Sequence, residues 1–265
     1  MLQMTSGIDP ATNAEVMVQA IGGAAMAGAT MLFTPEMSAM VDRDRTRAAP
    51  QVVAEEDSPL LTVLRDAAAR AGIWVALGSM AVLREDGLWA NRSLVIDGSG
   101  AIAARYDKIH MFDVDLASGE RWRESNAYAP GEEVVTVQTP LGKLGLTVCY
   151  DLRFPALFEA LGRAQCDLIA IPAAFTVPTG AAHWHVLQRA RAIEATAFVV
   201  CAAQVGRHED GRDTYGHSLV IDPWGDVLLD MGGTAPGLEF AEIDPARIAA
   251  VRAQVPCLAN KRVIG

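Results

Sequence analysis

Short apolar runs alternate with longer stretches of helical periodicity along most of the chain. The runs of strand length cover residues 2–5, 30–33, 73–77, 143–149, 167–171 and 198–202. The stretches with apolar residues at helical spacing cover residues 11–27, 58–72, 154–165 and 182–196. Ser58 followed by Pro59 is a typical helix start, because serine caps a helix and proline fits its first turn. Strands that alternate with helices in this way predict an α/β fold built in layers.

Turn residues in the middle and near the end of the chain predict antiparallel pairing. Glu85-Asp86-Gly87 and residues 97–100 each separate two apolar runs, as hairpin turns do. Pro223-Trp224-Gly225 divides residues 218–229 in the same way. Residues 107–131 and 206–215 are polar connections, and one as long as the first is usually functional. Because there is no linker and no repeat of solenoid type, we expect one domain over residues 1–265.

Residues 143–155 combine a strand, a bend and a helix start around one cysteine. The strand leads to Cys149, and apolar residues follow at helical spacing, at Phe154, Leu157, Phe158 and Leu161. This arrangement is typical of a nucleophile elbow, which presents a side chain at the carboxyl edge of a sheet near the amides of a helix start. A cysteine that only packs in the core is the alternative interpretation.

Two charged residues also directly follow predicted strands. Glu36 follows the run at residues 30–33, and Lys108 follows a strand that ends at Tyr106. A reactive cysteine needs a base for its proton and a cation for the oxyanion that it creates, and these residue types supply both. Because strand ends meet at one edge of an open α/β sheet, we expect the three side chains to converge there. Taken singly, each charged residue is also explained as a solvated surface group.

Composition and charge exclude several classes of function. The chain has 265 residues, 51% hydrophobic and 20% charged, which is ordinary for a globular enzyme. Its formal net charge of −10, without any basic run, argues against nucleic acid or an anionic membrane as a partner. No run is long and apolar enough to span a bilayer, no secretion signal opens the chain, and the four cysteines form no Cys-x-x-Cys pair. We therefore expect a cytoplasmic protein with free thiols.

The five histidines form no metal-binding motif. His183 and His185 lie on a predicted helix, where positions two residues apart point in different directions. Neither His-Glu-x-x-His nor Cys-x-x-Cys is present. We therefore expect no metal and no cofactor. Arg189, Arg191 and Glu194, further along this helix, are expected to form structural ion pairs.

Five segments, in order along nearly the whole chain, resemble the carbon–nitrogen hydrolase, or nitrilase, superfamily. They are Thr34-Pro35-Glu36 and residues 106–113, 148–155, 183–194 and 215–225. The resemblance implies a four-layer αββα sandwich that pairs into homodimers or larger homo-oligomers, with the helix after Cys149 near the subunit interface. It also implies a hydrolase that acts on linear amides.

Carried over position by position, the resemblance implies a role for each candidate residue. Glu36 is then the general base, Lys108 stabilises the tetrahedral intermediate, and Cys149 is the nucleophile. Glu124 matches a second family glutamate that positions the lysine and the substrate, and the backbone N–H of Tyr150 adds an oxyanion donor. The implied reaction passes through a thioester and releases a carboxylate and ammonia.

Within the superfamily, the sequence is most similar to the Nit branch of amidases. The similarity lies in residues 171–184, in residues 202–208 and in the run around Cys149. It implies as substrate a small amide of an acidic 2-oxo acid, such as deaminated glutathione. Phe175 would then shape the pocket wall, and the substrate carboxylate would bind one of four arginines: Arg153, Arg207, Arg121 or Arg123.

Several alternatives remain open from the sequence. Within the Nit branch, an ω-amidase that acts on 2-oxoglutaramate or 2-oxosuccinamate is one alternative. Another branch, of aliphatic amidases, N-carbamoyl hydrolases or nitrilases, is a second. A cysteine hydrolase of the papain kind would use His110 or His217 as its base, which would leave Glu36 and Lys108 without roles. An inactive family member that serves as a dimeric scaffold is a non-enzyme alternative, against which the intact candidate residues argue.

Overall fold

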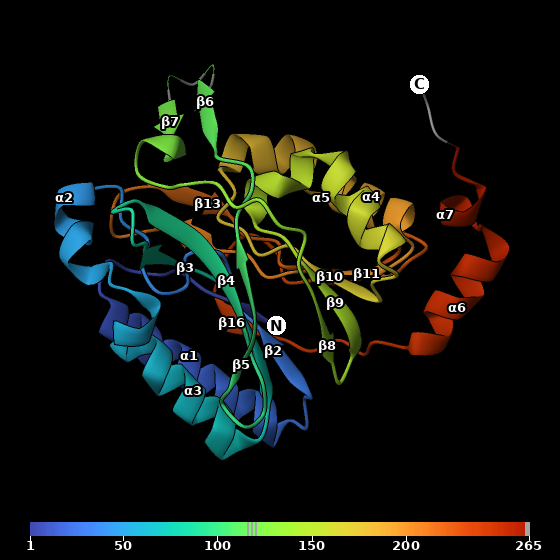
Figure 1. The fold of residues 1–265 in the computed structure, drawn as a ribbon, viewed down its shortest axis with the longest axis horizontal. Helices are drawn as coiled ribbons and strands as arrows, with labels where there is room; N and C mark the ends of the chain where they lie inside the picture. Colours follow the sequence, from blue (N-terminus) through green and yellow to red (C-terminus); the bar gives the residue numbers. More distant parts are fainter. Residues whose placement is uncertain (116, 118, 120, 263–265) are drawn as a thin grey trace.

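Two β-sheets pack face to face between two layers of helices in the computed structural model of this chain (Figure 1). The structure describes residues 1–115, 117, 119 and 121–262. This αββα sandwich confirms the α/β fold class and the layers expected from the sequence.

The first sheet comes from the amino-terminal half of the chain. Its strands, in spatial order, are β2 (Met31–Phe33), β3 (Trp74–Leu83), β4 (Trp89–Ile96) and β5 (Ile102–Asp107). β2 and β3 run parallel, and the other neighbours pair antiparallel through the two predicted hairpin turns. The antiparallel pairing expected for this section is therefore confirmed.

The second sheet has parallel strands at its centre. In spatial order its strands are β15 (Val227–Asp230), β14 (Leu219–Ile221), β11 (Phe198–Cys201), β10 (Leu168–Ala170), β9 (Gly142–Leu146) and β8 (Thr136–Thr139). β9, β10 and β11 run parallel, and the strands outside them pair antiparallel. β10 and β11 are buried along their whole length, which explains their continuous apolar sequences.

Among the described residues, three two-stranded ribbons lie outside the sheets. β1 (Leu2–Gln3) pairs with β16 (Gly237–Leu238), β6 (Asp113–Asp115) with β7 (Arg121–Arg123), and β12 (Val205–Arg207) with β13 (Asp213–Tyr215). The last two ribbons lie where the sequence indicates only polar connections. Strands of three residues are too short to show the alternation that identifies a strand in a sequence.

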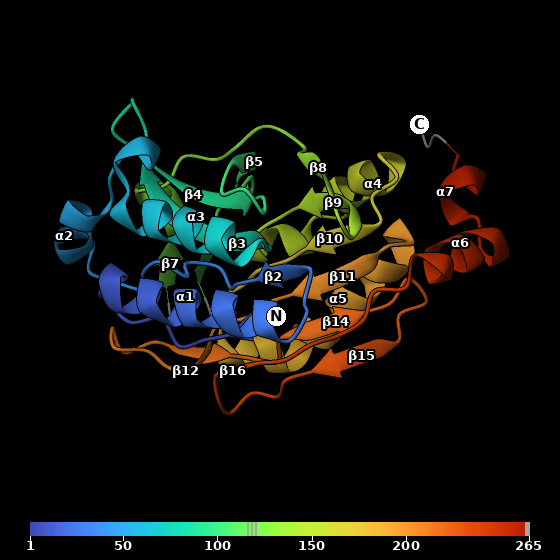
Figure 2. The same ribbon diagram turned by 90° about the horizontal axis from the view of Figure 1, so that it is seen from below.

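Helices cover the outer face of each sheet. α1 (Pro10–Met26) and α3 (Pro59–Ala71) lie on the first sheet, and α4 (Pro155–Arg163) and α5 (Val177–Ala195) lie on the second (Figure 2). From α1 and α3 at the lower left of Figure 1 to α4 and α5 at its upper right, the order of the layers is helices, sheet, sheet, helices. The short α2 (Arg45–Ala48) lies at one end of the molecule, and α6 (Pro245–Gln254) and α7 (Cys257–Asn260) lie at the other (Figure 1). Within the described residues, no helix has the length and apolar content that crossing a bilayer requires.

Clear capping residues made two helix boundaries predictable. Ser58 Oγ accepts a hydrogen bond from the Leu61 amide (3.2 Å), and Gly72 ends α3 with a φ of +65°. α4 begins at the predicted Pro155, although a five-residue 3-10 turn, Cys149–Arg153, separates it from the cysteine.

α5 is the helix whose start the sequence misplaces. It begins at Val177, whereas the pattern indicates a start near residue 182. Pro178 and Gly180 are typical of a loop and conceal the first turns. Proline in fact fits a first turn, and Gly180 lies so close to the Tyr215 ring that a Cβ would overlap it.

Alternating side chains divide the core into two layers. Leu32 of β2 packs with α1 and α3, whereas its neighbours Met31 and Phe33 pack towards the second sheet. β3 and β4 alternate in the same way. The two sheets are thereby held together, and the residues that follow β2, β5 and β9 are brought to the same region.

A β-bulge in β3 shapes the segment that carries Glu36. The register of β3 against β4 shifts at this bulge. The Gly78 amide donates a hydrogen bond to Thr34 Oγ1 (3.0 Å), and a Cβ at Gly78 would overlap the carbonyl oxygens of Thr34 and Pro35. The glycine therefore lets the backbone before Glu36 lie directly against β3.

We expect Gly78→Ala to lower the free energy of unfolding by about 1–3 kcal/mol, because the added methyl group must displace backbone rather than a flexible side chain. Gly22→Ala is the matched control, since a Cβ at this position of α1 meets no atom within 4 Å. That change should be neutral or stabilise by up to about 1 kcal/mol. Urea denaturation measures both, and an unchanged stability of Gly78→Ala would contradict the role of the bulge.

Candidate active site

Cys149 lies on a strained bend between β9 and α4. Its φ is +48°, in the left-handed region that residues with a Cβ rarely adopt. Its amide donates to the Pro172 carbonyl (2.8 Å), and only 7% of its surface is exposed. The residue lines a cavity beyond the end of β9, as a nucleophile elbow does.

Asp151 holds this bend from the interior. Its Oδ2 accepts hydrogen bonds from the Tyr106 hydroxyl (2.6 Å) and the Val148 amide (2.9 Å). Its Oδ1 accepts a hydrogen bond from the His110 amide (3.0 Å) and lies 2.7 Å from His110 Nδ1. This one carboxylate therefore joins the end of β5, the connection that follows it and the elbow.

Glu36 follows β2, and both of its carboxylate oxygens are fixed. Oε1 accepts hydrogen bonds from Lys108 Nζ and from Asn91 Nδ2, both at 3.0 Å. Oε2 accepts a hydrogen bond from the Ala174 amide (2.9 Å), and the Glu36 carbonyl accepts one from Gln204 Nε2 (3.0 Å). The carboxylate is thus buried in a single, well-defined orientation.

Lys108 is a buried cation between two carboxylates, with 2% of its surface exposed. Its Nζ lies 3.0 Å from Glu36 Oε1, and 3.1 and 2.9 Å from the two carboxylate oxygens of Glu124. Burial alone lowers the pKa of a lysine, but the charges of Glu124 and Glu36 outweigh it and hold the pKa of Lys108 well above its usual value. The side chain therefore stays positively charged at neutral pH.

Glu124, which contacts Lys108, lies in the long polar connection between residues 107 and 131. It begins a 3-10 turn, Glu124–Asn126, directly after β7, and its Oε2 accepts a hydrogen bond from the Phe112 amide (2.7 Å). The residue pattern alone does not distinguish it from an ordinary charged loop residue, whereas the family resemblance does.

Asn91 belongs to the same cluster, and sequence reasoning misses it. Its Nδ2 donates to Glu36 Oε1 (3.0 Å) and to Glu124 Oε1 (3.1 Å), two oxygens that Lys108 also contacts. It lies on β4 with 2% of its surface exposed. The signal available in the sequence is a polar amide within a largely apolar strand, since burial of such a group is unfavourable unless it is hydrogen-bonded.

The Cys149 thiol shares this environment. Burial, and then the negative charge of Glu36, raise the pKa of the thiol well above that of an ordinary cysteine, and the charge of Lys108 opposes this only in part. The resting thiol is therefore protonated at neutral pH and must pass its proton to a base as it reacts. The structure thus brings together the three residues that we expected to converge, with Glu124 beside them.

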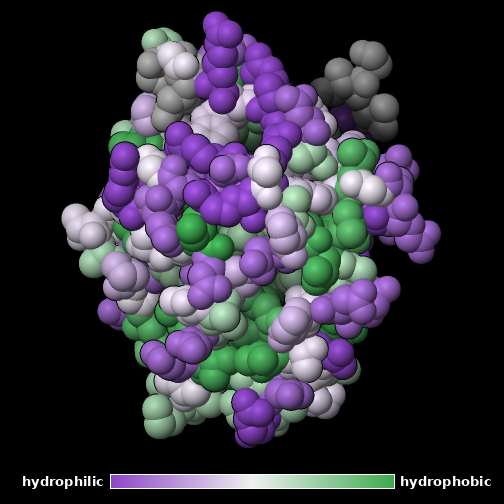
Figure 3. Space-filling view, turned by 90° about the vertical axis from the view of Figure 1, so that its left-hand side faces the viewer, coloured by the Kyte–Doolittle hydropathy of each residue, from purple (hydrophilic) through white to green (hydrophobic). Residues whose placement is uncertain are grey.

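One cavity of about 410 Å³ is lined by these four residues, with Tyr150 and Phe175 in its wall. Five arginines are among the described residues that line it: Arg43, Arg45, Arg121, Arg123 and Arg212. The face that carries α2 in Figure 1 is hydrophilic over most of its upper half (Figure 3). Because the chain as a whole is acidic, this concentration of arginine indicates an anionic ligand.

Two arginines indicated by the resemblance lie elsewhere. The Arg153 guanidinium stacks over the Phe175 ring, 5.3 Å from its centroid. Arg207 forms an ion pair with Asp213 (2.6 Å) on the β12–β13 ribbon. In the described part of the chain neither arginine lines the cavity, whereas the other two candidates do.

The histidines of the papain-like alternative are engaged with other partners. His110 contacts Asp151, and His217 Nδ1 lies 2.9 Å from Asp230 Oδ1. The charged neighbours that shift the pKa of the Cys149 thiol are instead a carboxylate and an ammonium group. The geometry therefore favours a carboxylate over an imidazole as the base.

A buried cysteine on an elbow, next to a fixed carboxylate and a permanent cation, defines a hydrolase that uses cysteine. The family model for carbon–nitrogen hydrolases matches residues 1–253, and this chain belongs to that family. It is 39% identical to the deaminated glutathione amidase of Yersinia enterocolitica, over 100% of this chain and 92% of that protein. It is 38% identical to the deaminated glutathione amidase of Bos taurus, over 98% of this chain and 80% of that protein.

Solved structures agree with this assignment. The C. elegans NitFhit protein aligns with a TM-score of 0.90 and 34% identity, over 98% of this chain and 64% of that one. A mutant of the amidase from Nesterenkonia sp. AN1 aligns with a TM-score of 0.83 and 25% identity, over 98% of this chain and 92% of that one. In that structure the acetamide moiety of fluoroacetamide is added covalently at the active-site cysteine. The present protein is accordingly a cysteine-dependent amidase.

We expect Cys149 to react slowly with iodoacetamide at pH 7 and faster at higher pH, because its pKa is raised and only the thiolate is nucleophilic. In Glu36→Gln a neighbouring negative charge is gone, so the pKa of the thiol should fall and alkylation at a given pH should be faster. Mass spectrometry measures both rates in a Cys257→Ser background, which removes the exposed thiol. A pH profile that Glu36→Gln does not change would contradict this account of the thiol.

Proposed function

We propose that this amidase hydrolyses deaminated glutathione, with Cys149 as nucleophile, Glu36 as general base and Lys108 as the cation that holds the oxyanion. Glu124 positions Lys108. The observation that carries the proposal is that one cavity is lined both by these four residues and by several arginines. Deaminated glutathione has a carboxylate at each end, and two relatives at 38–39% identity are named as its amidases.

In the first half of the reaction, the Cys149 sulfur attacks the amide carbonyl carbon while its proton moves to Glu36. Negative charge develops on the carbonyl oxygen, beside Lys108 Nζ and the Tyr150 amide. Tyr150 is the second residue of a 3-10 turn, where helix geometry gives the amide no partner within the turn. The C–N bond then breaks, Glu36 gives its proton to the leaving nitrogen, and a thioester remains on the sulfur.

In the second half, water attacks the thioester carbonyl and Glu36 takes one proton from it. The C–S bond breaks, the product carboxylic acid leaves, and Glu36 returns the proton to the sulfur. Because the pKa of Lys108 is held well above neutral pH, this residue serves as a fixed cation and not as a proton donor. The contact between its Nζ and Glu124 Oε2 (2.9 Å) keeps it in place through both halves.

The leaving group distinguishes the candidate substrates. The scissile amide of deaminated glutathione joins a 2-oxoglutaryl group to the nitrogen of cysteine, so the amine released is cysteinylglycine. The ammonia expected from the sequence forms only from a primary amide, such as 2-oxoglutaramate. An ω-amidase that acts on primary amides is compatible with the same site.

A substrate panel tests the proposal. Turnover is compared for deaminated glutathione, 2-oxoglutaramate, 2-oxosuccinamate, an aliphatic amide, an N-carbamoyl amino acid and a nitrile, with 2-oxoglutarate and ammonia measured separately. Fastest turnover of deaminated glutathione, without ammonia release, supports the proposal. Faster turnover of 2-oxoglutaramate or 2-oxosuccinamate would identify an ω-amidase instead, and faster turnover of the nitrile or the N-carbamoyl compound would assign the protein to a different branch.

We further propose that residues 1–265 act as one domain in a cytoplasmic homodimer. The candidate catalytic residues come from both halves of the chain, which supports a single domain. Cys149, Cys166, Cys201 and Cys257 are free thiols, which is typical of a reducing compartment. The homodimer rests on the family resemblance.

We expect Cys149→Ala and Glu36→Gln each to abolish release of 2-oxoglutarate from deaminated glutathione, because the first removes the nucleophile and the second the base. Circular dichroism should show that both variants fold. Cys257→Ser is the matched control and should keep its activity, because this thiol lies on α7, outside the cavity. Near-normal turnover by Cys149→Ala would refute the assignment.

Arg45 is the cavity arginine that we expect to bind a substrate carboxylate. One of its guanidinium nitrogens donates to the Arg123 carbonyl (2.6 Å), and no carboxylate of the described residues lies within ion-pair distance of it. The other four cavity arginines each contact Asp115 or Asp210. Among the described residues, Arg45 is therefore the cavity arginine that no carboxylate already contacts.

Arg45→Gln should raise the KM for deaminated glutathione about 10- to 100-fold, since a hydrogen bond to a charged group contributes about 1.5–3 kcal/mol. The kcat should change less, and an uncharged aliphatic amide should be hydrolysed as before. Arg207→Gln is the comparison variant and should leave the KM near its normal value. A larger rise in KM for Arg207→Gln than for Arg45→Gln would reverse this assignment.

A further inference from the structure

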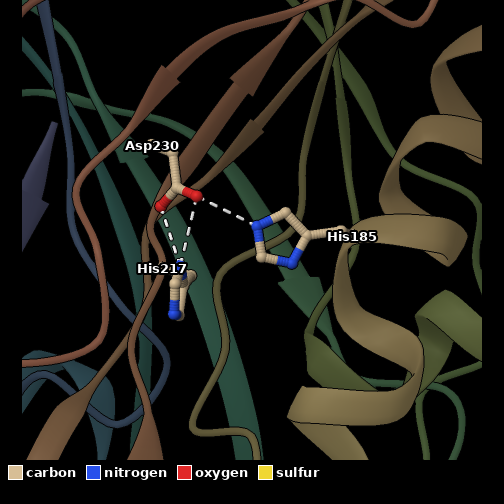
Figure 4. A group of neighbouring side chains, drawn as sticks. All are labelled: His185, His217 and Asp230. Carbon is tan, nitrogen blue, oxygen red and sulfur yellow. Dashed lines mark hydrogen bonds and ion pairs between the residues drawn. The ribbon is translucent and has the colours of Figure 1, made fainter.

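His185, His217 and Asp230 meet at one point where α5 lies beside the β14–β15 hairpin (Figure 4). His185 Nε2 lies 3.0 Å from Asp230 Oδ2. His217 Nδ1 lies 2.9 Å from Asp230 Oδ1 and 3.2 Å from Oδ2. One ligand atom from each residue lies within 4.8 Å of the other two. The three side chains come from α5, from the connection between β13 and β14, and from the end of β15.

Backbone contacts hold His217 in this position independently of the cluster. Its φ is +53°, in the left-handed region. Its amide donates to the Gly232 carbonyl (2.8 Å), and its carbonyl accepts a hydrogen bond from Nε1 of the buried Trp184 (2.7 Å). The Tyr215 ring stacks on its imidazole, with 4.5 Å between centroids. Strained backbone of this kind, fixed by its surroundings, is typical of ligand sites.

Asp230 is fixed in a similar way. Its Oδ1 also accepts a hydrogen bond from the Gly232 amide (2.9 Å). Trp184 directly precedes His185 on α5 and donates a hydrogen bond to the His217 carbonyl. This contact holds the two histidines next to each other. The three side chains are 26–35% exposed, so a small ion and a water molecule can reach them.

Two imidazole nitrogens and one carboxylate oxygen are ligands that Zn²⁺ prefers. Tetrahedral Zn²⁺ with bonds of about 2.0–2.2 Å places its ligand atoms about 3.3 Å apart. The nitrogen–oxygen distances of 2.9–3.2 Å here therefore need only a small outward movement, and the two imidazole nitrogens, which lie within 4.8 Å of each other, must reach the same spacing. We propose that His185, His217 and Asp230 bind one divalent transition-metal ion of the Zn²⁺ class, with water as the fourth ligand. The ion fastens α5 to the β14–β15 hairpin.

This site is distinct from the catalytic one. None of its three residues is among the described residues that line the cavity of Cys149. The sequence predicts no metal site, because His183 and His185 are expected to point in different directions. The structure agrees on this pair: His183 Nδ1 lies 3.2 Å from an Arg153 nitrogen, and His183 is not part of the cluster. The partners of His185 are 32 and 45 positions further along the chain, so no spacing motif connects them.

Equilibrium dialysis against Zn²⁺ tests the proposal, in a Cys149→Ala, Cys257→Ser background that removes thiols able to compete for the metal. We expect one Zn²⁺ per chain. His185→Gln and Asp230→Asn should each weaken binding at least 10-fold. His183→Gln is the matched control on the same helix, and it should bind Zn²⁺ as the parent does.

Thermal unfolding gives a second measurement, because an ion that binds only the folded chain raises the Tm. Zn²⁺ should raise the Tm of the parent and of His183→Gln, but not that of His185→Gln. Absence of stoichiometric Zn²⁺ binding would overturn the proposal. Equal loss of binding in His183→Gln and His185→Gln would also overturn it, because it would identify adventitious binding to surface histidines.

Discussion

The buried ammonium group of Lys108, held between Glu36 and Glu124, is the interaction on which the rest of the structure depends. Two buried carboxylates would repel each other without it, and a buried lysine without them would lose its proton. The lysine lies 72 positions from Glu36 and 16 from Glu124 in the chain, so the cluster exists only after β2, β5 and the polar connection have packed together. Loss of the lysine would leave two buried carboxylates without a compensating charge, which is strongly destabilising. Lys108 therefore stabilises the fold at the same place where the proposed chemistry needs a cation.

Unusual backbone geometry places the reacting groups around this cluster. Met37, directly after the glutamate, has a φ of +54°, and Cys149 has a φ of +48°. Each conformation is unfavourable alone and persists because neighbouring elements fix it. The Met37 amide donates a hydrogen bond to Oγ of Ser79 in the β3 bulge (3.0 Å). The Val148 amide, directly before the cysteine, donates one to Asp151 Oδ2 (2.9 Å). The strain thus lies directly after Glu36 and at Cys149 itself, and neighbouring elements support it in both places.

Local signals made the helices, the hairpins and the main candidate residues predictable. Ser58 and Pro155 act within a few residues of their own positions, and Glu36, Lys108 and Cys149 are recognisable because each follows an apolar strand. Long-range contacts are what the sequence conceals. Asn91 contacts two carboxylates distant in the chain, the helix position 180 requires a glycine because a Cβ would overlap the Tyr215 ring, and Arg45 reaches the cavity from a short helix. Each of these cases depends on a contact between residues that are distant in the sequence. Such contacts produce no repeating pattern of apolar and polar residues from which they could be predicted.

The distribution of charge explains how an acidic protein can admit an acidic substrate. The chain carries a formal net charge of −10, yet arginines line the cavity, and Arg43, Arg121 and Arg123 are 51%, 82% and 44% exposed. Deeper in the cavity, the buried lysine faces two carboxylates and therefore offers no excess positive charge. The carboxylates of the proposed substrate would be attracted to the exposed arginines and repelled from the buried glutamates, so the uncharged amide would be the part that reaches the thiol. Under the proposed function, charge would thus orient the substrate before the sulfur meets the carbonyl carbon, and it would favour amides that carry a carboxylate at a distance from the scissile bond.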